Sequence, residues 1–162
     1  MNAPAVVDRG ARSLGFDDLE VVIAIDRAHT GRARRHFFEK RFAAAKAEPK
    51  DFLHIGIQRG GALRGFAIVR ILRGEFGRER AVAVLDAVGV EPHSQERGIG
   101  QALMNELVEN LGAMGVHSLQ SLADWTNHDL LRFFKASGFG LALRLALERP
   151  VAEPMQEASE EV

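Results

Sequence analysis

Apolar residues recur along this chain with two different periods. Spacings of three and four residues, typical of a helix with one buried face, run through residues 19–30, 32–47, 99–111 and 127–137. Alternating or continuous apolar runs, typical of strands, occupy residues 52–58, 63–72, 80–90, 117–123 and 141–147. This order predicts a mixed α/β (α+β) domain, with helices on both faces of a mainly antiparallel sheet.

Capping and turn residues set the expected ends of these elements. Asp17 and Glu20 have the spacing of a capping box at the start of the first helix, with Asp in place of Ser or Thr. The pair Gly60–Gly61 predicts a hairpin turn between two strands. Gly138 is a natural C-terminal cap for the last helix.

The two ends of the chain differ from its middle. Residues 1–12 are expected to be flexible, with a possible short edge strand at residues 5–7. Residues 13–149 form the predicted domain. Residues 150–162 are acidic and contain a second proline, a composition typical of disorder.

Composition excludes several classes of protein. With 162 residues and 46% apolar content, the chain suits one domain with a full core. A net charge of −1 gives no reason to expect nucleic acid or an anionic membrane as partner. The chain has no cysteine, which excludes disulfides and a thiolate nucleophile. The histidines lack metal-ligand spacing, so no metal is expected. The sequence shows neither a signal peptide nor an apolar run of about 20 residues, as a membrane span needs, so a cytoplasmic location is expected.

A glycine-rich loop, Gly98-Ile99-Gly100, precedes the third predicted helix. A Walker A loop is excluded because Gln-Ala follows where Lys-Ser/Thr is needed. A dinucleotide fingerprint is weak because Leu103 stands where a third small residue is required. The loop still suits an anion, since glycines let backbone amides approach a phosphate and the helix presents unpaired N–H groups and its positive dipole end. A helix start that is merely glycine-rich is the alternative.

Two segments together resemble the GNAT superfamily of N-acetyltransferases. The first is Gln95-Glu96-Arg97-Gly98-Ile99-Gly100, which is similar to that family's coenzyme A motif, Gln/Arg-x-x-Gly-x-Gly/Ala. The second follows about thirty residues later, with Asn127 and then Phe133-Phe134-Lys135-Ala136-Ser137-Gly138-Phe139. The resemblance covers roughly residues 5–149.

The resemblance implies acetyl-CoA as cosubstrate and a pair of parallel strands that splay apart at its site. Main-chain groups of Val88, Gly89 and Val90 would pair with the pantetheine arm. Amides of the loop from Glu96 to Gln101, Ile99 included, would hold the pyrophosphate. Asn127 and Phe134 would line the other side, and the thioester would sit where the strands part, near Gly89 and Ala123.

Asp86 is the candidate catalytic base. In residues 80–90 the even positions are four valines and Asp86, so the pattern places one charge on an apolar face that would look toward the cleft. A lysine-like amine has a pKa near 10.4, so its deprotonation at pH 7 adds roughly 4.6 kcal/mol to the barrier unless a base removes the proton. The alternative is that Asp86 forms an ion pair with a neighbouring arginine. Glu91 is a second, weaker candidate.

The general acid is missing from the pattern. The family commonly uses a tyrosine to protonate the departing thiolate, and Phe134 occupies that position in a chain without any tyrosine. His128 or Ser137 could substitute. A thiol with a pKa of about 8.5 leaves as the thiolate at modest cost, so water is the alternative proton donor.

The sequence therefore predicts an N-acetyltransferase that moves the acetyl group of acetyl-CoA to a primary amine by direct attack in a ternary complex. The acceptor, a small molecule or a protein amine, stays open, and a homodimer is plausible from the family. A non-catalytic acyl-CoA-binding or sensing module is the alternative function.

Overall fold

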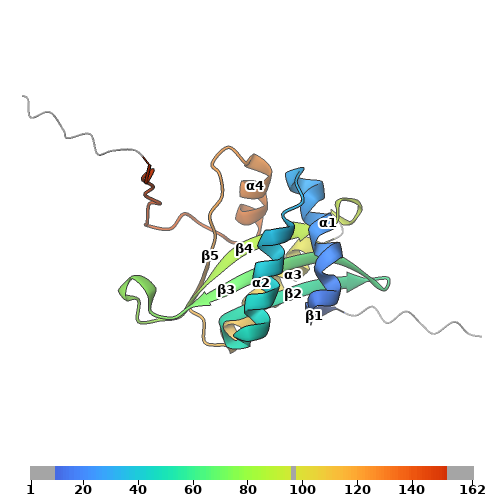
Figure 1. Cartoon of the computed structure of the whole chain (residues 1–162), viewed down its shortest axis with the longest axis horizontal. Helices are drawn as coiled ribbons and strands as arrows, with labels where there is room; N and C mark the ends of the chain where they lie inside the picture. The colour runs from blue at the N-terminus through green and yellow to red at the C-terminus, as the bar shows by residue number, and fades with distance from the viewer. Residues whose placement is uncertain (1–9, 96–97, 153–162) are drawn as a thin grey trace, which may run out of the picture.

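A single five-stranded sheet organises the protein (Figure 1). The computed structural model describes residues 10–95 and 98–152. The strands are β1 (Ala11–Ser13), β2 (Phe52–Arg59), β3 (Ala62–Leu72), β4 (Val82–Val90) and β5 (Ser118–Gln120), and they lie in that order across the sheet. Neighbouring strands are antiparallel except β4 and β5, which are parallel. The mixed, mainly antiparallel α/β fold is confirmed.

Helices cover both faces of the sheet. They are α1 (Leu19–Thr30), α2 (Arg35–Ala47), α3 (Ile99–Ala113) and α4 (His128–Ala136). Figure 1 shows α1 and α2 on one face and α3 behind the sheet, and each layer has its own core. Phe38 and Phe66 are fully buried in the α1/α2 core, and Leu103 and Leu107 are fully buried in the α3 core.

Glycines end several elements where the sequence predicts it. Gly60 and Gly61 both adopt positive φ, 57° and 77°, and form the turn between β2 and β3. Two consecutive positive φ values match the twist of a tight hairpin and exclude most other residues. Gly31 closes α1 with φ 72°, and its N–H donates to the Arg27 carbonyl.

The predicted face of four valines and Asp86 is wrong. Ile68 pairs with Ala87 and Val69 with Leu85, so Asp86 is the extra residue of a β-bulge in β4. A bulge shifts the alternation of side chains by one residue. Ala83 and Leu85 therefore pack in the α3 core, as do Val88 and Val90 beyond the bulge, while Asp86 points to the α2 side, where it meets Arg41.

The predicted capping box is also wrong. A short 3₁₀ turn, Phe16–Asp18, precedes α1, and the side chain of Asp18 accepts the Gly15 N–H at 2.9 Å. Asp18 is held further by two hydrogen bonds from Arg12, which lower the pKa of its carboxyl. Glu20 pairs instead with Arg35 of α2.

The last predicted strand does not form. Residues 141–147 are irregular coil with a bend at Leu143, and Leu141, Leu143, Leu145 and Leu147 are 88–104% exposed. Similarly, the expected strand 117–123 shortens to Ser118–Gln120, because only those residues pair with β4. The possible strand at residues 5–7 lies outside the described residues, whereas Ala11–Ser13 supplies the observed edge strand. None of the helices in the described ranges has the length and apolar character to cross a bilayer.

Candidate functional site

The two parallel strands separate partway along their length. β4 and β5 pair through Val82–Ser118, Ala83–Leu119 and Val84–Gln120. One residue further on, the Ser121 hydroxyl donates to the Leu85 carbonyl at 3.0 Å. No strand pairing joins the two beyond this point in the part of the chain that the structure describes. A gap opens in the ladder along the last residues of β4.

Main-chain groups of β4 point into that gap. The Glu91 N–H donates to the Arg64 carbonyl at the β3 side at 2.7 Å. Because successive residues of a strand direct their N–H and C=O groups to opposite sides, those of Val90 and Val88 point to the β5 side. An extended ligand could therefore add to β4 as a strand would.

His29 is a site residue that sequence reasoning missed. The residue belongs to α1, sixty-one positions before Val90 in the chain, and its Nε2 lies 2.6 Å from the Val90 carbonyl oxygen. The contact places an imidazole at the mouth of the gap. No local sequence motif predicts this contact, because the contact depends on how α1 packs against β4.

The glycine loop has a conformation that requires glycine. Gly98 adopts φ 73° and its carbonyl accepts the Ala102 N–H at 2.9 Å, so it is the N-cap of α3. By helix geometry the amides of residues 99–101 have no acceptor within the helix. Ile99 is 4% exposed and anchors this turn in the core, and the first turn carries no acidic residue. The arrangement suits an anion.

Gly100 allows another element to approach the loop. A Cβ on Gly100 would lie 2.9 Å from Cε2 of Phe133 in α4, closer than side chains tolerate. Gln101 turns outward and donates to Asn105 at 2.8 Å. Gln95 is exposed in the turn before the loop. Glu96 and Arg97, two of the predicted cofactor residues, lie outside the described residues.

The second family block forms α4 beside the gap. Asn127 is its N-cap, and its side-chain oxygen accepts the Leu130 N–H at 3.2 Å. Phe134 is 7% exposed and packs against Phe139 with ring centroids 4.7 Å apart. Both residues therefore have structural roles that explain their presence without a ligand.

Asp86 is engaged by two arginines. Arg70 of β3 donates to both carboxylate oxygens, at 2.6 and 2.9 Å, and Nε of Arg41 lies 2.8 Å from Oδ2. The Asp86 side chain is only 8% exposed. A carboxylate that accepts from Arg70 on both oxygens, with the charge of Arg41 beside one of them, is poorly placed to accept a proton from an amine. The geometry favours the ion pair that the sequence left open as an alternative.

His54 is buried beside this cluster. It is 6% exposed, and its Nε2 has no hydrogen-bond partner among the described residues. Burial lowers the pKa of His54 to about 4, with Asp86 opposing the shift and Arg41 adding to it. The imidazole is therefore neutral at pH 7.

Glu91, the weaker candidate base, is bound within its own turn. It accepts the Ser94 hydroxyl at 2.7 Å, which lowers the pKa of its carboxyl, and Arg64 lies 3.6 Å away. A lowered pKa makes a carboxylate a weaker base.

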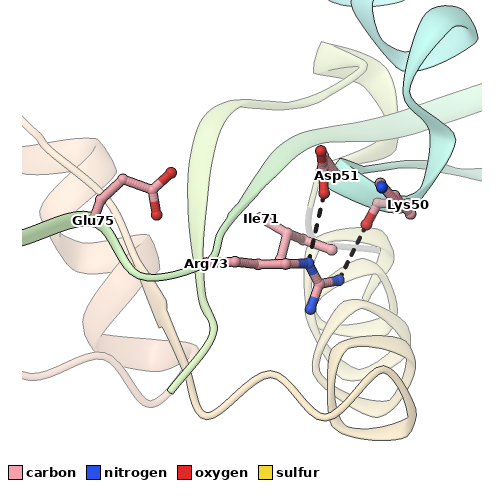
Figure 2. A pocket seen from close by; sticks show the side chains of 5 residues that line it. All are labelled: Lys50, Asp51, Ile71, Arg73 and Glu75. Atoms are coloured by element: carbon pink, nitrogen blue, oxygen red, sulfur yellow. Dashed lines mark hydrogen bonds and ion pairs between the residues drawn. The ribbon is translucent and has the colours of Figure 1, made fainter. Parts of the chain in front are cut away.

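A separate hollow of about 310 Å³ lies at the other end of β3 (Figure 2). It is lined by Lys50, Asp51, Ile71, Arg73 and Glu75. Figure 2 shows Arg73 reaching toward Asp51 and the Lys50 carbonyl, with separations of 3.5 and 3.3 Å. Because Leu72 pairs with Val82 while Gly65 pairs with Val90, this hollow is remote from the glycine loop. Within residues 10–95 and 98–152, no cluster of His, Asp or Glu is suited to hold a metal ion.

Comparison with known proteins bears on this arrangement. The chain is 29% identical over 112 residues to the [ribosomal protein bS18]-alanine N-acetyltransferase of Escherichia coli, covering 67% of this chain and 70% of the relative. Its fold is similar to that of AAC(6')-Iy in complex with the bisubstrate analogue CoA-S-monomethyl-acetylneamine, at 17% identity and a TM-score of 0.70 over 86% and 96% of the two chains. A putative acetyltransferase from Agrobacterium tumefaciens gives a TM-score of 0.72 at 16% identity, over 88% and 100%.

The profile of the acetyltransferase (GNAT) family matches residues 20–139, which include the splayed strands, the glycine loop and α4. The chain belongs to the acetyltransferase (GNAT) family and is an acetyl-CoA-dependent acyltransferase.

Proposed function

We propose that this protein transfers the acetyl group of acetyl-CoA to a primary amine by direct attack within a ternary complex. The observation that supports the proposal is that the gap beside β4 and the N-terminus of α3 lie next to each other. The gap beside Val88 and Val90 opens next to the N-terminus of α3, where Gly98 starts the helix with φ 73°. An extended arm and a pyrophosphate would find matching partners there.

The residues present fit such a ligand. Main-chain groups of Val88 and Val90 would hold the pantetheine arm, whereas those of Gly89, which the sequence also suggested, point to β3. The amides from Glu96 to Gln101 would hold the pyrophosphate. A Cβ on Gly89 would lie 2.7 Å from the ring of Phe66, so glycine keeps β4 close to the α1/α2 core at this point. When bound, acetyl-CoA supplies an activated thioester.

The acceptor is proposed to be a primary amine, with a protein N-terminal alanine as the first class to test. The Escherichia coli relative is named for an alanine of a ribosomal protein, and it matches 67% of this chain. The structural neighbour with the acetylneamine analogue supports the fold alone, because only 17% of its residues are identical.

Proton transfer is proposed to rely on water or on the substrate more than on Asp86. Arg70 and Arg41 both contact the Asp86 carboxylate, and it faces the α2 side of the sheet. Phe134, at the position of the family's tyrosine, has no proton to give and is 7% exposed. The thiolate then leaves without an acid from this residue, which is feasible for a thiol of pKa about 8.5.

Two measurements test the proposal. Thermal unfolding is followed with acetyl-CoA, CoA, ATP and NAD in parallel, where a ligand at 100 times its Kd stabilises by about 2.7 kcal/mol. We expect a rise in Tm with acetyl-CoA and CoA alone. CoA release is then measured with peptides that begin with alanine, and with the same peptides blocked at the N-terminus as a control. No rise with saturating acetyl-CoA would refute the site, and equal turnover of blocked peptides would refute the acceptor class.

A further inference from the structure

The ion pairs at the β4 bulge leave one positive charge uncompensated. Asp86 is the only carboxylate in ion-pair contact with Arg41 or Arg70 among the described residues. Glu75 acts on Arg70 only from a distance, as the last of the causes that raise the pKa of that guanidinium. His54 is buried beside these groups and is neutral at pH 7, so it supplies no negative charge. Because an unpaired charge is costly in a partly buried place, a second anion would stabilise this cluster.

Arg41 has the donors to bind that anion. Its Nε is buried, lies 2.8 Å from Oδ2 of Asp86 and makes no hydrogen bond. In the described part of the chain no hydrogen bond engages its two Nη groups either, although the side chain is 27% exposed. The guanidinium lies over the Phe37 ring, 5.1 Å from its centroid, with the Arg34 guanidinium 4.9 Å from the same centroid. Stacking on a ring holds the plane of a guanidinium and leaves its edge free to bind a carboxylate through two parallel hydrogen bonds.

Arg41 lies close to the gap between the parallel strands. The contact of the Leu85 carbonyl with the Ser121 hydroxyl lies where the gap begins, and Asp86 is the next residue of β4. Val88, a proposed partner of the pantetheine arm, is two residues further on, about 7 Å along the strand. Asp86 directs its carboxylate to the α2 side, where it meets Arg41. An amine that attacks a thioester in the gap is therefore within the length of a dipeptide of the Arg41 guanidinium.

The surface around Arg41 is strongly basic. Residues 27–46 contain seven arginines and lysines and one acidic residue, Glu39, in a chain whose net charge is −1. Three of the arginines have acidic partners outside this stretch, in the pairs Arg34–Asp26, Arg35–Glu20 and Arg41–Asp86. The other four basic residues are exposed and make no ion pair with the described residues: Arg27, Arg32, Lys40 and Lys46. Exposed charges of one sign attract an anionic ligand and disfavour a cationic one.

We propose that the acceptor of this enzyme carries a carboxylate about 7 Å from its amine, and that Arg41 binds this carboxylate through its two Nη groups. In a protein acceptor, the carboxylate is an acidic side chain directly after the N-terminal residue. The inference rests on the proposed acetyl transfer and adds the charge of the acceptor to it. Arg41 is then a residue that determines specificity, and Asp86 is a positioning residue that holds Arg41 in place.

The experiment compares kcat/KM for peptides that begin with alanine and differ only at the second residue, which is glutamate, glutamine or lysine. Charge-assisted hydrogen bonds to a partly exposed guanidinium are expected to favour glutamate over glutamine by roughly tenfold, with lysine the poorest. In Arg41→Gln the ratio of glutamate to glutamine is expected to fall to about one. This ratio is taken within one preparation, so it does not depend on the fraction of the variant that is folded. Arg35→Gln is the matched control, because it removes the same charge from α2 at an exposed pair with Glu20, and the ratio should persist.

The outcomes separate this inference from the proposed function. Turnover of the glutamine peptide as fast as the glutamate peptide by the wild type, or an unchanged ratio in Arg41→Gln, would overturn the inference and leave acetyl transfer standing. An equal fall in Arg35→Gln would assign the preference to the general charge of α2 and overturn the role of Arg41. The Kd for acetyl-CoA is expected to stay unchanged in Arg41→Gln, and a rise with an unchanged peptide ratio would show that Arg41 binds the cosubstrate instead. Absence of turnover with every alanine peptide would refute the proposed acceptor class and this inference with it.

Discussion

Asp86 and Arg70 form a two-point ion pair across neighbouring strands, with Nε and Nη2 of the arginine 2.6 and 2.9 Å from the two carboxylate oxygens. The pair sits at the bulge of β4, where Asp86 has no strand partner. A bidentate pair fixes both side chains in one geometry. It therefore holds the bulge, and with it the change of face that brings Val88 and Val90 to the α3 side.

Asp86→Asn is expected to lower stability more than catalysis. The substitution leaves two guanidiniums beside a neutral amide, at a cost of about 1–3 kcal/mol in the free energy of unfolding. Urea unfolding measures that loss, and kcat per folded molecule is expected to change little. Arg70→Met is the control, because it breaks the same pair without touching the carboxylate.

The alternative role for Asp86 predicts a different result. Loss of a general base typically lowers kcat by a factor of about 10²–10⁴. If Asp86→Asn lost activity on that scale while Arg70→Met did not, with both variants folded, Asp86 would be the base and our structural assignment would be wrong.

Gly98→Ala is expected to weaken acetyl-CoA binding. Gly98 adopts φ 73°, where an L side chain costs about 1–2 kcal/mol, so the first turn of α3 should rearrange and misplace its amides. Titration of CoA measures the change in Kd. Gly112→Ala is the matched control, since Gly112 lies inside the same helix with open space around it. It should raise stability by about 0.5–1 kcal/mol and leave Kd unchanged. Equal Kd values in the two variants would contradict the role of the loop.

His54 is expected to make folding sensitive to pH between about 4 and 6.5. Its pKa falls to about 4 in the folded protein because it is buried. The unfolded chain then binds the extra proton first, so stability is full above pH 6.5 and falls as the pH drops, by at most about 3 kcal/mol. Urea unfolding at several pH values measures the slope.

The control for this window is His54→Gln, which cannot gain the proton. Carboxylates with lowered pKa values, such as Asp18, lose stabilisation only below about pH 4 and so act outside most of the window. An unchanged slope in His54→Gln would show that another group is responsible.

Two similar ion pairs between α1 and its neighbours are expected to differ in strength because they differ in burial. Arg34 makes a bidentate contact with Asp26, whose side chain is 4% exposed, whereas Arg35 makes one with Glu20, which is 70% exposed. Asp26→Asn should lower the unfolding free energy by about 1.5–3 kcal/mol. Glu20→Gln should produce no measurable change, because solvent screens an exposed pair. Equal losses in the two variants would contradict the argument from burial.

The sequence alone determined the features that depend on local chemistry. Gly60 and Gly61 predict their hairpin because only glycine adopts two positive φ values readily. The spacing of leucines along α3 predicts its buried face, and the glycines before it predict an anion site at its start. Together with the Asn127 and Phe134 block, they were enough to indicate the family.

Tertiary structure decided what depends on contacts between distant residues. The bulge at Asp86 follows from how β4 pairs with β3, so the simple alternation of valines could not reveal it. The contact of His29 with Val90 follows from the crossing of α1 over the sheet. Residues 141–147 have the pattern of a strand, but a strand forms only by pairing with a neighbour, and that pairing is absent from the described residues. The periodicity of the sequence determines which side chains of an element lie on one face, whereas the tertiary structure determines which other element packs against that face.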